Sequence, residues 1–244
     1  MQDNIEQTMA PDEAEQYREF KRVKRIEEAK ASVLKIECDC LSQLADKNSV
    51  KETCKACNTL EIGAIVVFPS FVKACVSYLG KDPQVSLIAA IAYPYGEETT
   101  DVKVAAVKRA VKDGVDEVEV CAPIAFIRDG NFIYFKKECK KLKKAAKVRA
   151  LRLVINTALL NEKELIKACV TAADAGVNCL RLNNADGELI TKVKTALKGK
   201  CLIKGDRAEN STQFASLCLS GADTVSCTDA TELAQYLLKQ AEND

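Results

Sequence analysis

The sequence predicts an α/β fold, a single closed barrel of eight parallel strands known as the (β/α)8 or TIM barrel, with an extra helix at its N-terminus. Three observations support this prediction. Eight short apolar runs alternate with longer amphipathic stretches, and several helical runs end at glycine. The chain has 244 residues, a length that α/β barrels commonly use for one domain.

The strands are predicted from runs rich in β-branched and other apolar residues, because such runs are typical of parallel strands covered on both faces. The eight runs are 33–37, 63–68, 86–92, 117–121, 150–156, 178–182, 201–204 and 223–226. Stretches of helical periodicity lie between them, at 101–113, 132–147, 161–175 and 229–240. An open doubly wound sheet is the alternative, but the glycine-rich phosphate turn expected after its first strand is missing.

The ends of the predicted helices agree with this alternation. Asn161 and Asp229 stand where N-cap residues are expected, each shortly before a glutamate. Gly114, Gly176 and Gly221 follow helical runs, at the position where a left-handed residue commonly ends a helix. An apolar strand begins soon after each of these glycines, as the barrel requires.

The chain is predicted to have two parts. Residues 1–32 form a charged helical extension whose helix covers 11–31 and is rich in glutamate, lysine and arginine. Residues 33–244 form the barrel domain, because no linker or change of composition interrupts them.

The composition limits the classes of partner. Lysine plus arginine (36) and aspartate plus glutamate (35) nearly cancel, so the net charge favours neither nucleic acid nor an anionic membrane as a partner. No stretch approaches the roughly 20 apolar residues of a membrane span, and the N-terminus lacks the apolar core of a secretory signal. We therefore expect a cytoplasmic protein, and leave monomer and homodimer both open.

The twelve cysteines are many, and histidine is absent. Two close pairs, Cys38/Cys40 and Cys54/Cys57, have no usual zinc-finger spacing, so we expect buried thiols and neither a metal nor a cofactor. Without histidine, acid–base chemistry falls to Asp, Glu, Lys, Tyr or Cys.

Glu119, Arg152, Arg181 and Lys204 are charged residues that fall inside predicted apolar strands. An unpaired charge there is expensive, so we expect these side chains to be grouped, one acid among three bases. Two interpretations remain open. The group is either an internal salt-bridge network without chemistry, or a cleft that takes an anionic ligand or perturbs one lysine.

Five segments, in order, resemble the deoxyribose-phosphate aldolase family. Residues 63–72 resemble its second-strand segment, which ends in a similar Pro-x-Phe-Val. The other matches are YPYG at 93–96 to Phe-Pro-His-Gly, DEVEV at 116–120 to Asp-Glu-Val-Asp-Val, LRLVINT at 151–157 to Leu-Lys-Val-Ile-Leu-Glu-Thr, and AGVNCLR at 175–181 to Ala-Gly-Ala-Asp-Phe-Val-Lys. The resemblance covers about residues 35–229.

The resemblance implies cleavage of 2-deoxyribose 5-phosphate to acetaldehyde and glyceraldehyde 3-phosphate through a lysine Schiff base. In this sequence Arg181 stands at the Schiff-base position, and guanidinium does not act as an amine nucleophile. Lys204 matches the family's second lysine, and Glu119 replaces its aspartate. Arg152 and Asn156 stand where the family has lysine and glutamate.

The resemblance also implies an altered phosphate pocket. The family's glycine pair becomes Arg207-Ala208, and its Gly-Thr-Ser segment becomes Ser226-Cys227-Thr228. Backbone anion sites depend on glycine-permissive conformations, and Arg207 is a possible substitute charge. The candidate ligand-binding residues are Arg152, Arg207, Ser226, Thr228 and Asn183.

Three functional interpretations follow. In the first, the protein is catalytically impaired or inactive and serves as a binding or scaffold module, with a protein partner. In the second, it is an active aldolase in which Lys204 is the Schiff-base amine, Arg181 lowers its pKa and Glu119 is the acid/base. In the third, arginines and Lys204 clamp a small phosphate or carboxylate ligand, such as a phosphorylated sugar or aldehyde, in the barrel mouth.

Overall fold

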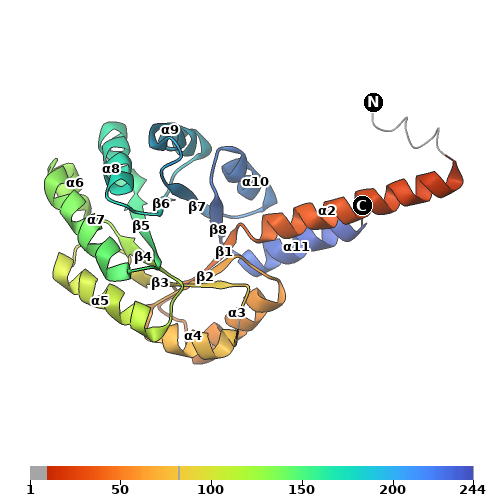
Figure 1. Ribbon diagram of the computed structural model, residues 1–244, viewed down its shortest axis with the longest axis horizontal. Coiled ribbons are helices and arrows are strands. Elements are labelled where there is room, and N and C mark those ends of the chain that lie inside the picture. The colour runs from red at the N-terminus through yellow and green to blue at the C-terminus, as the bar shows by residue number, and fades with distance from the viewer. Residues whose placement is uncertain (1–9, 82, 244) are drawn as a thin grey trace.

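A computed structural model describes residues 10–81 and 83–243, so residues 1–9 of the predicted extension lie outside the described part. Parallel strands form a closed barrel in chain order, in which β1 pairs with both β2 and β8. The (β/α)8 prediction is confirmed (Figure 1). The strands are β1 (Ile36–Cys40), β2 (Ala64–Val67), β3 (Ser86–Ile91), β4 (Glu117–Cys121), β5 (Ala150–Asn156), β6 (Cys179–Asn183), β7 (Leu202–Ala208) and β8 (Thr224–Cys227).

Helices surround the strands, and α2 runs alongside α11 and projects beyond the barrel (Figure 1). Within residues 10–81 and 83–243, no helix is both long enough and apolar enough to cross a bilayer. The helices are α2 (Pro11–Val33), α3 (Lys47–Thr59), α4 (Val72–Leu79), α5 (Thr100–Asp113), α6 (Ile124–Arg128), α7 (Phe132–Ala146), α8 (Glu162–Asp174), α9 (Gly187–Leu197), α10 (Ser211–Leu219) and α11 (Ala230–Asn243), with 3-10 turns η1 (Pro69–Phe71) and η2 (Thr157–Leu159).

The predicted N-caps have the expected contacts. The Asn161 side chain accepts a hydrogen bond from the Glu164 amide at 3.0 Å, and Asp229 accepts one from the Glu232 amide at 3.0 Å. Gly114, Gly176 and Gly221 all have positive φ, as their positions after helices require.

Six of the eight strands lie within one residue of their predicted bounds, and β1 and β7 differ by more. The first strand begins at Ile36 rather than at residue 33, because α2 continues through Val33. Strand β7 continues to Ala208, past the predicted end at 204, because Gly205 and Ala208 still pair with β8. This extension keeps Asp206 inside a strand.

The two faces of the strands have different environments. Outward residues such as Ile65 and Val120 join the large apolar cluster that packs the barrel against its helices. Inside the barrel, β2 and β3 contribute a small apolar cluster of Ala64, Val66, Ile88 and Ala90. The remaining interior is occupied largely by ionisable side chains, so the charged network lies against an apolar wall.

Gly63, just before β2, permits a close backbone approach. A Cβ atom there would lie 2.0 Å from the carbonyl oxygen of Leu34. We expect Gly63→Ala to lower the free energy of unfolding by about 1–3 kcal/mol or more, because backbone must move. Gly205→Ala is the matched control, since its nearest neighbours would lie at 3.4 and 3.5 Å. Urea unfolding measures both, and equal effects would contradict the close-approach argument.

Candidate active site

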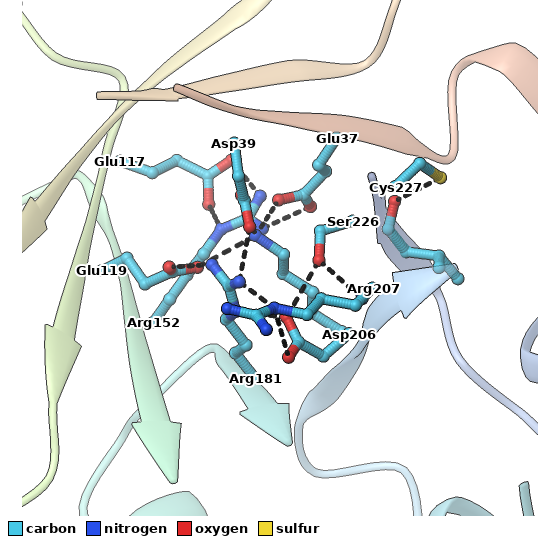
Figure 2. A network of polar contacts seen from close by, with 12 residues as sticks. Glu37, Asp39, Glu117, Glu119, Arg152, Arg181, Asp206, Arg207, Ser226 and Cys227 are labelled. Atoms are coloured by element: carbon cyan, nitrogen blue, oxygen red, sulfur yellow. Dashed lines mark hydrogen bonds and ion pairs between the residues drawn. The ribbon is translucent and has the colours of Figure 1, made fainter. Parts of the chain in front are cut away.

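Ionisable side chains from β1 and β4–β7 meet inside the barrel (Figure 2). They are the carboxylates Glu37, Asp39, Glu117, Glu119 and Asp206 and the cations Arg152, Arg181 and Lys204, joined in one chain of ion pairs. The prediction that the four strand charges are grouped is confirmed. The predicted balance of one acid among three bases is wrong, because four further carboxylates join them.

Arg181 lies at the centre of the network, with its side chain only 3% exposed. Its Nη1 donates to Glu119 at 2.9 Å. Its Nη2 donates to Asp39 at 2.5 Å and to Asp206 at 2.6 Å. Its Nε donates to Asn183 at 2.8 Å and to Asp206 at 3.2 Å. The guanidinium is thus held by three carboxylates, drawn in Figure 2, and by the amide of Asn183, and these four partners lie on four strands.

Lys204 is fully buried beside Arg181. Its Nζ lies 2.9 Å from Glu37, 3.2 Å from Asp39 and 3.3 Å from Glu119. Burial and the neighbouring guanidinium of Arg181 both lower the pKa of Lys204, but the three carboxylates outweigh them. The net result is a pKa above the ordinary lysine value, so Lys204 is an ammonium ion at neutral pH.

Arg152 occupies the opposite side of the network, away from the carboxyl-terminal ends of the strands. Its Nη1 donates to Glu37 at 2.5 Å, and its Nε and Nη2 donate to the two oxygens of Glu117 at 2.6 and 2.9 Å. Because Glu117 is the first residue of β4, this bidentate pair lies toward the amino-terminal ends of the strands. Arg152, a candidate ligand-binding residue, therefore has its donors on internal carboxylates.

The carboxylates of β1 are stabilised as anions. Burial raises the pKa of Glu37, but the cations Lys204 and Arg152 lower it by more. The net pKa of Glu37 lies well below its usual range. The pKa of Asp39 is lowered in the same way by Lys204 and Arg181, against the effect of burial. These two carboxylates are ionised whenever the protein is folded near neutral pH.

A cavity of about 530 Å³ opens at the carboxyl-terminal ends of the strands. Of the candidate residues, Asn183 and Arg207 line it, together with Asp206 and Cys121. Other lining residues from the mouth loops are Tyr93, Tyr95, Glu97, Arg128, Asn156 and Asn184. Arg128, on α6, was not anticipated, because nothing in the sequence distinguishes it from a surface arginine.

The segment that resembles the family's phosphate pocket has few amides to offer a ligand. Arg207 keeps a left-handed φ of 55°, yet its amide donates to the Ser226 hydroxyl at 3.2 Å. Ser226 is buried and donates in turn to Asp206 at 3.0 Å. The Thr228 amide donates to the Ala208 carbonyl at 2.9 Å, and Thr228 is itself an exposed residue.

All twelve cysteines are free thiols, most of them buried. Cys38 and Cys40 on β1 pack against the apolar cluster that contains Cys54 and Cys57 of α3. In the described part of the chain, no group of three or more Cys, Asp or Glu side chains has an arrangement that could hold a metal ion.

The fold is shared by known aldolases of the (β/α)8 class. A protein described as "QR15, an Aldolase" superposes with a TM-score of 0.81 at 22% identity, over 85% of this chain and 96% of that one. A putative deoxyribose-phosphate aldolase from Coccidioides immitis gives a TM-score of 0.81 at 19% identity, over 85% of this chain and 86% of the other.

The sequence comparisons define the family. The model of the DeoC/LacD family of aldolases matches residues 37–215, and the chain belongs to this family. Deoxyribose-phosphate aldolase of Clostridium botulinum is 31% identical over 141 residues, which are 58% of this chain and 66% of that protein. The enzyme of that name from Thermococcus gammatolerans is 31% identical over 150 residues, 60% of this chain and 67% of its own length. This chain thus spans just under two thirds of the C. botulinum enzyme.

Removing Arg152 should destabilise the fold strongly. We expect Arg152→Met to lower the free energy of unfolding by about 3–5 kcal/mol, because the buried Glu37 and the half-buried Glu117 would both lose a cation partner. Arg149→Met is the control, since Arg149 is 41% exposed and its ion pair with Asp116 is 3.5 Å long. Its effect should stay below about 1 kcal/mol in urea unfolding. Similar losses in the two variants would contradict a structural role for the buried pair.

Acid should weaken the network. Because the pKa of Glu37 is lower in the folded state than its ordinary value of 4.5, its ionisation stabilises the protein above that pH. This contribution is lost as the pH falls from 4.5 toward the lower folded-state value. We expect the urea midpoint to fall on acidification, and to fall less steeply in Glu37→Gln. An equally steep acid dependence in Glu37→Gln would show that other groups are responsible.

Proposed function

We propose that this protein is a deoxyribose-phosphate aldolase-like protein that has lost the Schiff-base mechanism and acts as a binding or scaffold module. The observation that carries the proposal is the state of the two basic side chains at the catalytic positions. Both are buried, and both are bound by several carboxylates.

The first support comes from Arg181. A guanidinium remains protonated and offers no amine to a carbonyl carbon. Burial lowers the pKa of Arg181, but Glu119, Asp39 and Asp206 raise it well above its ordinary value. Arg181 is therefore a structural cation that replaces the family's nucleophile.

The second support concerns Lys204, the alternative nucleophile. An active enzyme of this kind needs a neutral amine, which arises when a lysine is desolvated beside another cation. Arg181 exerts that influence on Lys204, but Asp39, Glu119 and Glu37 reverse it. A fully buried ammonium bound by three carboxylates is a poor starting point for imine formation.

The mouth cavity suggests what the module binds. Three asparagines, two tyrosines and two arginines supply donors around a volume of about 530 Å³. A small polar ligand held without a covalent bond fits such a lining. The second candidate function is recognition of a phosphate or carboxylate group, and the observation that favours it is the pair Arg128 and Arg207 in the cavity wall.

We also propose a cytoplasmic location. All twelve cysteines are free thiols, the state that a reducing compartment maintains.

The proposal predicts that no imine forms. Purified protein is incubated with 2-deoxyribose 5-phosphate or acetaldehyde, reduced with borohydride, and analysed by mass spectrometry of the intact chain and its peptides. We expect the peptide containing Lys204 to keep its mass, because the ammonium is not a nucleophile. Deoxyribose-phosphate aldolase of C. botulinum, treated in parallel, is the positive control.

An adduct on Lys204 that disappears in Lys204→Ala would overturn the proposal and establish an aldolase with exchanged lysine roles. Modification confined to exposed lysines, at the level seen in denatured protein, agrees with the proposal. Binding of 2-deoxyribose 5-phosphate is measured separately by calorimetry on unreduced protein.

A further inference from the structure

The contacts of Arg181 are unevenly distributed among its carboxylates. Glu119 and Asp39 each receive one hydrogen bond from the guanidinium, whereas Asp206 receives two, from Nη2 at 2.6 Å and Nε at 3.2 Å. Nη2 and Nε lie on one edge of the planar guanidinium, so Asp206 fixes the orientation of the group as well as its charge.

Asp206 is itself held in place. Its Oδ1 accepts from the Ser226 hydroxyl at 3.0 Å, and its side chain is only 3% exposed. The residue lies within β7, two positions after Lys204, so both side chains point into the barrel. The Asp206 carboxylate therefore lies on the same inward face of β7 as Lys204.

The charge balance extends this argument to any amine at position 181. Five carboxylates meet three cations in the network. A lysine in place of Arg181 would enter a space bordered by Asp39, Glu119 and Asp206. Lys204 is bordered by three carboxylates as well, so each ammonium would be compensated by anions more strongly than it is repelled by the other.

We propose that Asp206 is a positioning residue that orients Arg181 and excludes a neutral amine at this position, so that restoring lysine alone does not restore imine chemistry. Replacing Arg181 by lysine and removing the Asp206 charge at the same time does restore imine chemistry. The inference rests on the proposed function, the loss of the Schiff-base mechanism. It adds that this loss involves Asp206 as well as Arg181.

The test compares Arg181→Lys with Arg181→Lys/Asp206→Asn. Each variant is incubated with acetaldehyde and cyanoborohydride over a series of pH values from neutral to alkaline, and the adduct on the residue-181 peptide is measured. We expect Arg181→Lys to react only under alkaline conditions. In the double variant the midpoint should fall by about 1–3 pH units, which means at least about tenfold more adduct at neutral pH.

Arg181→Lys/Glu209→Gln is the matched control. Glu209 is an exposed carboxylate just beyond β7, so Glu209→Gln removes the same charge near the mouth. Its profile should coincide with that of Arg181→Lys. Circular dichroism and urea unfolding check that all variants fold. If Arg181→Lys/Asp206→Asn does not fold, Arg181→Lys/Asp206→Ser takes its place.

The outcomes separate the two proposals. An adduct on Lys204 in the unaltered protein overturns the proposed function and leaves the Asp206 test readable on the residue-181 peptide. Equal pH profiles for Arg181→Lys and Arg181→Lys/Asp206→Asn overturn the role of Asp206. The same conclusion follows if Glu209→Gln shifts the profile as much as Asp206→Asn does.

Discussion

The interior of this barrel depends on the mutual neutralisation of buried charges. Removing a guanidinium or a carboxylate from water costs several kcal/mol, and ion pairs with good geometry are needed to offset that cost. Arg152, Arg181 and Lys204 each meet this condition by contacting at least two carboxylates. Glu37 contacts both Arg152 and Lys204, and it thereby joins the amino-terminal part of the network to the part below the mouth.

The same constraint separates structure from recognition. Charges used inside the network are already compensated, so the proposed recognition of a ligand falls to the residues that line the mouth cavity. Asn183 and Asp206 belong to both layers, because each contacts Arg181 and also lines the mouth cavity. Under the proposed binding function, a ligand in this cavity contacts Asn183 and Asp206, the side chains that hold the guanidinium of Arg181 in place.

Much of this arrangement was predictable from the sequence, and the misses have physical reasons. Strands 117–121 and 150–156 were predicted with their observed bounds, because the alternate apolar residues that pack against the helices leave a strong signal. Asp39 and Asp206 were missed as network members because each lies at or beyond the end of an apolar run. Only the barrel register shows that β1 and β7 continue through them. Periodicity does not show which cation a carboxylate will face.

The pairing of α2 with α11 has a consequence for how the barrel forms. Helix α11 contacts both β1 and β8, the paired strands most distant in sequence, and α2 packs on α11. During synthesis β1 can pair with β2 early, but its other edge stays unpaired until β8 has been synthesised, since contacts of long sequence separation form late. Because α11 follows β8 in the chain, it can dock on α2 and β1 only after the last strand has been synthesised, so the junction between β1 and β8 is covered by the last helix of the described chain.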